Sequence, residues 1–289
     1  MKTIAWLKGL TWVFIFIGTG FLITQLVPGM SRIGLSIYNQ GSLSSLFWLL
    51  MVGLAASQAL FNDKLEIKWR LGLLLISFLT VYISYVVVPG WKSGWVPAVI
   101  TLGVLLMLRS KHLALIIIII GIIATPFVVQ DLLATEEYSY ATRIEAWALI
   151  GEMVKVNPIL GLGPANYYYY TPLFPIRGYA VQFNSHNQFI DIIAQTGILG
   201  LLAFLWFITE LGLLGLQLQK KVRDGFPKAY VYGMLASLVG IIVSAMLGDW
   251  FLPFIYNIGY IGFQGSVFGW LFLGGLVALE QMTLITSDQ

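Results

Sequence analysis

Long apolar segments, separated by short polar stretches, recur along the whole chain. Several of them are long enough to cross roughly 30 Å of hydrocarbon as α-helices. We therefore expect an all-α integral membrane protein, a polytopic bundle that forms one domain over residues 1–289. The apolar runs predict about eight transmembrane helices, near residues 4–27, 43–60, 71–89, 93–108, 112–130, 187–216, 228–250 and 263–285.

One polar segment, residues 131–186, predicts a single large loop between the fifth and sixth helices. Inside it, residues 141–156 predict an amphipathic helix that lies on the membrane surface. The apolar stripe of this helix contains Ile144, Trp147, Ile150, Gly151 and Val154. We expect Asn157-Pro158 to end the helix and Gly161-Leu162-Gly163-Pro164 to form a tight turn.

The composition supports a membrane protein and removes several other classes. Hydrophobic residues make up 58% of the chain and charged residues 10%, whereas soluble domains carry about 25% charged residues. The net charge of +3 comes from basic residues spread between the spans, so no nucleic-acid partner is expected. The absence of cysteine excludes disulfides, thiolate zinc sites and cysteine nucleophiles. The first apolar run is too long for a cleavable signal peptide.

Lysine and arginine are distributed unevenly between the two sides that these helices define. Eleven of the 16 lie on the side that carries both termini. The other side holds Arg32, Lys92, Arg143, Lys155 and Arg177. Because cytoplasmic loops are enriched in Lys and Arg, we expect both termini in the cytoplasm and residues 131–186 outside. The chain would then lie in the cytoplasmic (inner) membrane, with this loop periplasmic if the cell has two membranes.

His186 is the first candidate for chemistry, because an imidazole titrates near neutral pH and lies here at the mouth of a helix. A lone histidine at a helix start is more often an ordinary polar surface residue. The loop before it has no Asp-x-Asp pair or His/Asp cluster with metal spacing. It also lacks a Gly-x-Ser-x-Gly elbow, and its glycines do not form a dinucleotide fingerprint. We therefore expect chemistry without a metal or cofactor.

Several short motifs come in a fixed order, most of them on the external side, with Arg109-Ser110-Lys111 at the expected cytoplasmic end of a helix. They are Trp91-Lys92-Ser93-Gly94-Trp95, Arg109-Ser110-Lys111, Arg143-Ile-Glu-Ala-Trp147, Asn157-Pro158-Ile-Leu-Gly161-Leu-Gly163, His186-Asn187 and Thr196-Gly197-Ile-Leu-Gly200. Over roughly residues 90–210 this order resembles the O-antigen ligase and polymerase superfamily of bacterial membrane glycosyltransferases.

The resemblance implies that the chain transfers a glycan from an undecaprenyl-diphosphate-linked donor to a glycan or lipid-glycan acceptor at the outer face of the membrane. It implies that basic residues hold the diphosphate and that the loop histidine acts on the acceptor hydroxyl. His186 is then the expected base and Arg143 the main catalytic cation, in a metal-independent, inverting displacement. The residues expected to bind the diphosphate or the acceptor are Lys92, Arg177, Asn187, Trp147 and Tyr168.

The chain departs from the family pattern in three respects. Lys92 stands where arginine is expected, so phosphate would meet a point charge without the bidentate fork. Gln195 replaces a common glutamate before the Thr-Gly pair. Family members often have ten or more spans, so we expect either missing amino-terminal helices or a reduced relative.

Each remaining candidate also has a simpler interpretation. Arg143 can snorkel from an interfacial helix and Lys92 can anchor a helix end, while Arg177 has only its loop position in its favour. The run of four tyrosines that includes Tyr168 is typical of an interfacial belt, with sugar stacking as the alternative.

Two acidic residues have no assigned role. Asp249 lies near the external end of its predicted span, where a carboxylate at a helix end is ordinary. Glu210 is an intramembrane carboxylate and therefore a candidate by default, but it lies nearer the cytoplasmic side.

Other functions remain open. Ligase and polymerase activities share these motifs, and a protein O-oligosaccharyltransferase is a third variant. A lipid or solute transporter is a different class, for which a kink at Pro126 would be modest support. A non-catalytic membrane scaffold is the last alternative.

Overall fold

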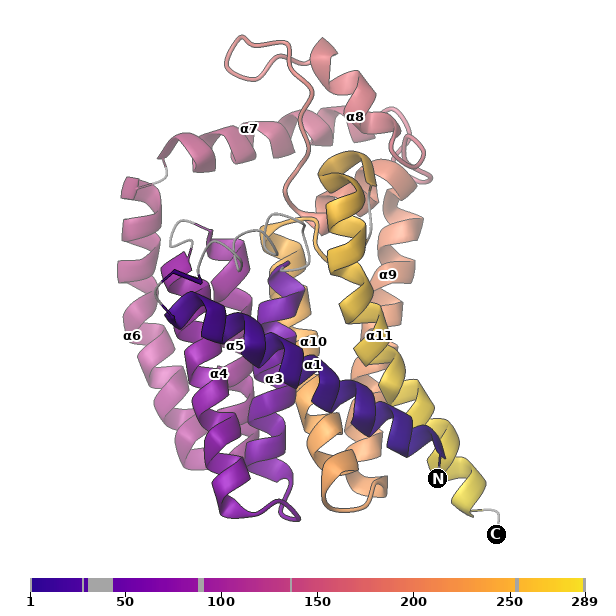
Figure 1. Ribbon diagram of the computed structural model, residues 1–289. Coiled ribbons are helices and arrows are strands. Elements are labelled where there is room, and N and C mark those ends of the chain that lie inside the picture. The colour runs from indigo at the N-terminus through magenta and orange to yellow at the C-terminus, as the bar shows by residue number, and fades with distance from the viewer. Residues whose placement is uncertain are drawn as a thin grey trace.

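The computed structural model describes residues 2–27, 29–30, 44–87, 91–135, 137–252 and 255–287. Over these residues the chain is all-helical, with ten α-helices, one short 3-10 helix and no sheet beyond an isolated bridge between Ile176 and Tyr179. The helices, shown in Figure 1, are α1 (Lys2–Leu26), α3 (Ser45–Phe61), α4 (Ile67–Val87), α5 (Lys92–Arg109), α6 (Lys111–Thr135), α7 (Glu137–Val154), α8 (Asn166–Tyr170), η1 (Thr171–Leu173), α9 (Gln188–Lys221), α10 (Phe226–Leu247) and α11 (Ile255–Ser287).

Six helices are long and apolar enough to cross a membrane: α1, α4, α5, α9, α10 and α11. They match six of the eight expected spans, so the chain is a multi-pass membrane protein. The other two predicted spans are shorter apolar helices, α3 and the segment Lys111–Phe127 of α6. The prediction of eight spans is therefore confirmed for six.

α3 lies at the centre of the bundle, where it packs against α4, α5 and α10. Its residues Ser45–Ala59 are all buried, as expected for a helix that is apolar on every side. Small residues let α3 and α10 approach closely: a Cβ added at Gly233 would lie 2.5 Å from the Ser57 hydroxyl and 2.8 Å from the Gly53 carbonyl oxygen. Such small-residue seams are typical of membrane helices.

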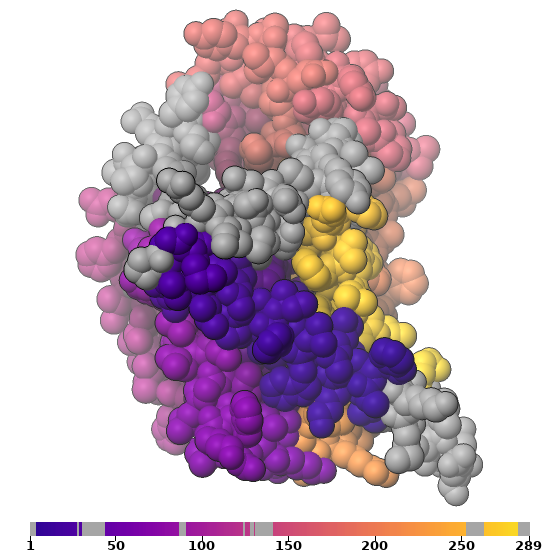
Figure 2. Space-filling view, in the orientation of Figure 1, coloured from indigo at the N-terminus to yellow at the C-terminus, as the bar shows by residue number. Residues whose placement is uncertain are grey.

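The outer helices carry large apolar side chains on their exposed faces. α1 runs across one face of the bundle (Figure 2), and it exposes Trp6 and Phe16 almost completely. Ile122 on α6 and Trp206 on α9 are similarly exposed. A monomeric soluble protein rarely exposes so much apolar surface, whereas a lipid bilayer covers it.

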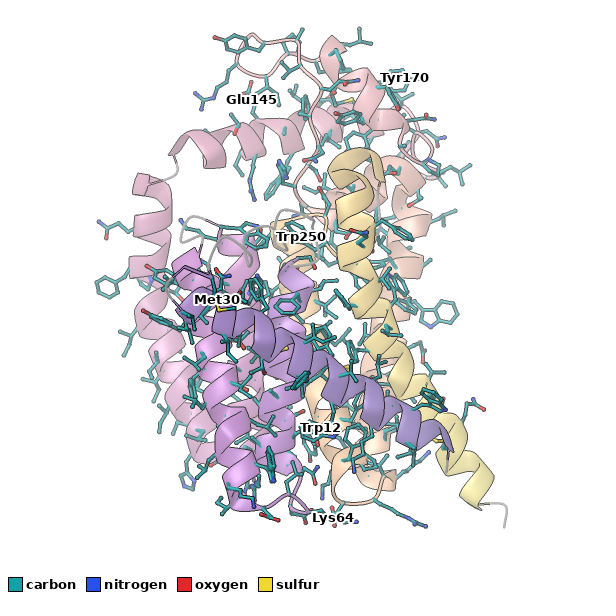
Figure 3. The ribbon with its side chains drawn as sticks, viewed as in Figure 1. Trp12, Met30, Lys64, Glu145, Tyr170 and Trp250 are labelled. Atoms are coloured by element: carbon teal, nitrogen blue, oxygen red, sulfur yellow. The ribbon has the colours of Figure 1, made fainter. Side chains whose placement is uncertain are left out.

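The two ends of the bundle differ in what they carry. The α3–α4 and α9–α10 turns lie at the same end as both termini (Figure 1), and the Lys64 side chain lies beside Gly225. At the opposite end lie α7, α8 and the loop that follows them; Glu145 and Tyr170 mark this end and Lys64 the other (Figure 3). We call residues 137–187 the cap.

α7 is helical where the sequence predicts a helix over residues 141–156, but its buried side chains coincide only in part with the predicted apolar stripe. The buried side chains are Ala146, Ile150 and Met153, whereas Ile144 is 42% exposed. The reason is that α7 packs on α9, and Ile150 and Met153 share a buried cluster with Tyr167. Packing against α9 and Tyr167 of the same chain, which the sequence pattern alone did not indicate, therefore decides which face of α7 is buried.

Candidate active site

The cap is attached to a break in α9. Gly197 has φ 66° and ψ −167°, a non-helical conformation inside the helix. The break leaves backbone groups without helical partners, and the segment after α7 binds them. Four backbone hydrogen bonds join the two segments, Ile198 N to Pro158 O (2.9 Å), Leu199 N to Ile159 O (3.4 Å), Leu162 N to Ala194 O (2.9 Å) and Gly163 N to Gln195 O (2.9 Å).

Two glycines make this attachment possible. A Cβ on Gly197 would clash with the Ile159 carbonyl, and one on Gly161 would lie 2.5 Å from the backbone of Gln195. Both have positive φ, which side chains rarely adopt. The Gly161 and Gly197 motifs of the sequence are therefore two halves of one backbone contact.

Gln195, which stands where a glutamate is common, also belongs to this contact. Its side chain is buried, and its Oε1 accepts a hydrogen bond from the backbone N–H of Ala165 (2.8 Å). A glutamate oxygen can make the same bond, so this departure preserves the acceptor.

His186 lies in the loop that enters α9, in a left-handed backbone conformation with φ 48°. The backbone N–H of His186 donates to Oδ1 of Asn184 (3.2 Å). The loop is also held from α7, because the Trp147 indole donates to the Ser185 carbonyl (2.7 Å). Backbone strain of this kind persists only where the surroundings enforce it.

Asn187 caps the first turn of α9. Its Oδ1 accepts hydrogen bonds from the backbone N–H groups of Phe189 (3.0 Å) and Ile190 (3.4 Å), as a good N-cap residue does. Asn187 thereby fixes the direction in which the chain leaves His186, and its expected contact with substrate stays a prediction.

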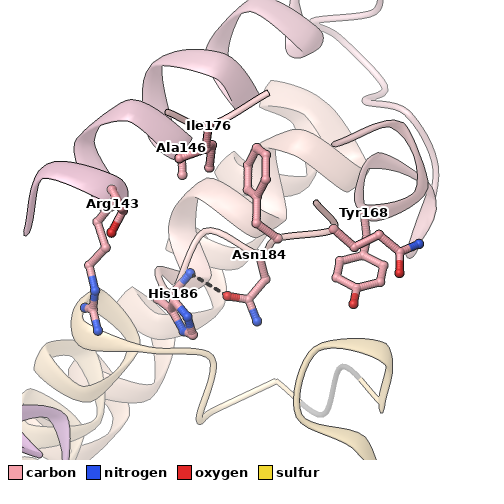
Figure 4. Close-up of a pocket in the computed structure, with 9 residues that line it drawn as sticks. Arg143, Ala146, Tyr168, Ile176, Asn184 and His186 are labelled. Carbon is pink, nitrogen blue, oxygen red and sulfur yellow. Dashed lines mark hydrogen bonds between the residues drawn. The ribbon is translucent and has the colours of Figure 1, made fainter. Parts of the chain in front are cut away.

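His186 lines a cavity of about 300 Å³ in the cap, and this volume is within the size range of small-ligand sites. In Figure 4, Arg143 extends from α7 toward His186, and Tyr168 lies beyond Asn184. The residues that line the cavity are Thr142, Arg143, Ala146, Tyr168, Ile176, Gln182, Phe183, Asn184 and His186. Three residues that the sequence singled out, His186, Arg143 and Tyr168, thus meet in one cavity.

The surroundings of His186 favour its neutral form. Although the His186 side chain is partly open to solvent, desolvation by the surrounding cap atoms and the nearby Arg143 guanidinium lower its pKa below the ordinary value of 6.5, and Asp191 opposes this shift. A neutral imidazole can accept a proton, as a general base must. Arg143 is itself half-buried, and its Nη1 donates to the carbonyl of Leu247 at the end of α10 (3.4 Å).

Behind this loop lies a buried polar group that was not predicted from the sequence. Oδ1 of Asp191 accepts hydrogen bonds from the Tyr167 hydroxyl and from the Ser185 hydroxyl (2.7 Å). Tyr167 and Asp191 are completely buried, whereas Tyr169 and Tyr170 are exposed. The tyrosine run therefore does not act as one belt. An acidic residue in the first turn of an apolar helix was the available indication for Asp191.

Two predicted cations lie outside the cavity lining. Arg177 is exposed at the turn beside Ile176, and its backbone N–H donates to Oε1 of Glu145 (3.0 Å). Lys92 begins α5, next to Trp91, whose ring contacts that of Trp250 edge-on at 5.5 Å. Lys92 therefore begins a helix that is preceded by a contact with the segment after α10.

Metal ligands need several donor side chains in one place. Within the part of the chain whose placement is described, no group of three or more His, Cys, Asp or Glu could hold a metal ion. The expected metal-independent chemistry stays a prediction.

The comparison with protein families agrees with the motif order. A family model described as O-antigen ligase matches residues 33–205, more than half of the chain. The match includes α7, the segment seated on α9, His186 and the break at Gly197. None of the curated proteins matches the chain.

Proposed function

The chain belongs to the O-antigen ligase family, which consists of membrane glycosyltransferase-type enzymes that act on lipid-linked glycans; from this membership we propose that it transfers a glycan from undecaprenyl diphosphate to an acceptor sugar. The observation that carries the proposal is that His186 and Arg143 line one cavity. His186 would supply a neutral base for the acceptor hydroxyl, and Arg143 would supply a positive charge for the leaving diphosphate.

In the proposed step, the acceptor hydroxyl oxygen attacks the anomeric carbon of the donor sugar. The new glycosidic bond forms as the bond between that carbon and the diphosphate oxygen breaks, and the diphosphate keeps the electron pair. His186 takes the hydroxyl proton. Attack opposite the leaving group inverts the anomeric centre.

Arg143 offsets the negative charge that develops on the leaving diphosphate. A guanidinium has five N–H donors, and the Leu247 carbonyl engages Nη1, so further donors remain for phosphate oxygens. A cation fixed in a half-buried site stabilises charge more strongly than one in water. Lys92 and Arg177 are proposed as weaker contributors at the edges of the site.

The proposed orientation has both termini in the cytoplasm and the cap outside. Its support is the grouping of basic residues: the α3–α4 and α9–α10 turns, which contain or adjoin Lys64, Lys68, Arg223 and Lys228, lie at the end opposite the cap. The positive-inside rule places that end in the cytoplasm.

A transporter is less well supported. Pro126 lies inside a continuous α6, and loop backbone groups bind the N–H groups and carbonyls released by the break in α9. In transporters, such freed backbone groups typically coordinate the transported ion. The break in this chain instead attaches the cap.

The test is a transfer assay with purified protein in lipid nanodiscs. The assay supplies an undecaprenyl-diphosphate-linked oligosaccharide with three acceptors: a lipid-linked sugar, a second donor molecule and a serine-containing peptide. We expect free undecaprenyl diphosphate and a glycosylated acceptor with inverted anomeric configuration, measured by mass spectrometry and NMR. The acceptor that reacts distinguishes ligase, polymerase and protein glycosylation. Intact donor with every acceptor, under conditions where the protein is folded, would refute the proposal.

A further inference from the structure

Asp249 lies behind the active site, beyond the stretch that the family model matches. The segment after α10 folds over the first turn of α9, where Oε1 of Gln188 accepts hydrogen bonds from the N–H groups of Phe251 (3.0 Å) and Leu252 (2.8 Å). Arg143 of α7 donates to the carbonyl of Leu247, the last residue of α10. Asp249 is enclosed between these contacts and is 2% exposed.

The carboxyl group of Asp249 has no donor among the described residues: neither of its oxygens receives a hydrogen bond there. Its polar neighbour is another buried carboxyl, that of Asp191 on α9. Two ionised carboxylates close together inside a protein repel each other and lack water. One proton shared between them removes both problems, because a protonated carboxyl donates to a carboxylate.

The contacts decide which aspartate carries the proton. Asp191 accepts hydrogen bonds from Tyr167 and Ser185 and lies in the first turn of α9, where the helix dipole favours a negative charge. Asp249 has neither kind of support. Burial and the adjacent Asp191 raise the pKa of Asp249 well above its usual range, although Arg143 opposes the shift.

We infer that Asp249 and Asp191 form a proton-sharing carboxyl pair that positions His186. Asp249 donates the proton, and Asp191 is the carboxylate that holds the loop through Ser185 and Tyr167. Both are positioning residues, and their effect on transfer rests on the function proposed above for His186.

The pair also sets the charge around the base. With one proton it contributes a single negative charge beside Arg143 and stabilises the imidazolium that forms when His186 takes the acceptor proton, as a buried aspartate does for other catalytic histidines. Loss of the shared proton at alkaline pH adds a second negative charge that competes with the diphosphate for Arg143. The groups that act on Asp249 are Asp191 of α9 and Arg143 of α7, and the Tyr167 hydroxyl of α8 hydrogen-bonds Asp191. Lys92 begins α5 next to Trp91, whose ring contacts that of Trp250, the residue after Asp249.

The first experiment detects the proton directly and needs no activity. Infrared spectra of protein labelled with ¹³C at the aspartate carboxyl carbons, in nanodiscs at neutral pH, report the carbonyl band of a protonated carboxyl. We expect this band in the wild type, its loss in Asp249→Asn and its displacement in Asp191→Asn. Asp224→Asn is the matched control, because Asp224 is an exposed carboxylate bound to Lys228 at 2.6 Å. A wild type without the band, or a band that survives Asp249→Asn, overturns the pair.

The second experiment measures the effect on His186. The chain has only two histidines, so the pKa of His186 can be followed by NMR in a His112→Gln background. We expect Asp191→Asn to lower it, because a negative charge is lost, and Asp249→Asn to shift it less, because an amide still donates to Asp191. Equal shifts in the two variants would contradict the assigned proton donor.

The third experiment uses the pH profile of transfer. Asp249→Asn should retain at least about tenfold more transfer than Asp249→Leu, since a misplaced base costs about 10- to 100-fold. It should also lack the alkaline decline of the wild type, which a merely structural role would not change. If the wild type shows the infrared band of a protonated carboxyl but transfers no glycan, the proposed function is refuted and the carboxyl pair is not. If the wild type transfers glycan but lacks this band, the carboxyl pair is refuted and the proposed function is not.

Discussion

The bundle around α3 and the cap are held together by different kinds of contact. α3 is enclosed by apolar and small side chains of α4, α5 and α10, so packing stabilises the bundle. The cap is attached by backbone hydrogen bonds at the break in α9 and by buried polar contacts around Ser185. Packing tolerates small adjustments, whereas hydrogen bonds depend on direction. The cap can therefore fix the position of a catalytic side chain, and the bundle supports it.

The largest expected effect follows from blocking the attachment of the cap. Gly197→Ala forces a Cβ against the Ile159 carbonyl at a positive φ, which should release the segment after α7 and lower transfer by about 100-fold or more. Hydrogen exchange of that segment should rise. Gly212→Ala in the same helix is the control, because its added Cβ lies 3.8 Å from Leu238. Equal behaviour of the two variants would show that the break is not the attachment point.

Removal of the cation should have the next largest effect. Arg143→Gln should reduce transfer by about 10²- to 10³-fold, the range for one electrostatic stabiliser. Lys155→Gln, which removes an exposed cation bound to Glu152 just after α7, should leave the rate near that of the wild type. Unchanged transfer in Arg143→Gln would show that the positive charge of Arg143 does not contribute to catalysis.

Arg143→Gln should also change the pH dependence of transfer. Because Arg143 helps to lower the pKa of His186, its loss should move the acid limb of the rate profile to higher pH. In the wild type the folded pKa lies below 6.5, so the stability linked to neutral His186 is present above pH 6.5 and is lost as pH falls through the folded value. An acid limb that stays in place in Arg143→Gln would contradict the coupling.

A smaller effect is expected where a single hydrogen bond holds the loop. Trp147→Phe keeps the aromatic ring but removes the donor to the Ser185 carbonyl. Loss of one such bond, about 1 kcal/mol, corresponds to roughly 3- to 10-fold in rate. Trp206→Phe is the matched control, since that indole donates a hydrogen bond to Glu210 on an exposed side of α9, away from the cap. Equal rates in both variants would show that Trp147 does not position His186.

The smallest effect on transfer is expected from a change in the bundle. Gly233→Ala crowds the seam between α3 and α10 and should cost about 1–3 kcal/mol of stability. Thermal unfolding in detergent should begin at a lower temperature, while the rate per folded molecule stays near wild type. A selective loss of transfer would mean that the bundle and the cap are not separable in this way.

The two regions also differ in how far the sequence predicts them. Apolar runs located the helices because lipid imposes length and composition on each span independently. Motif order brought His186 and Arg143 together as candidates, and the structure places both in one cavity. The buried face of α7 was predicted only in part: Ile150 is buried as expected, whereas Ala146 and Met153, outside the predicted stripe, are also buried where α7 packs on α9. Asp249 was left as an ordinary helix-end residue, because its partner Asp191 lies far away in the sequence and adjacency between them arises only in the folded chain.

The most direct test of the account compares the two histidines in the transfer assay. His186 lines the cavity in the cap, whereas His112 lies near the start of α6, outside that cavity lining. We expect His186→Ala to lower transfer by about 10²- to 10⁴-fold in a protein that inserts and unfolds like the wild type, and His112→Ala to retain the wild-type rate. Wild-type transfer by a folded His186→Ala protein would contradict the assignment of His186 as the base.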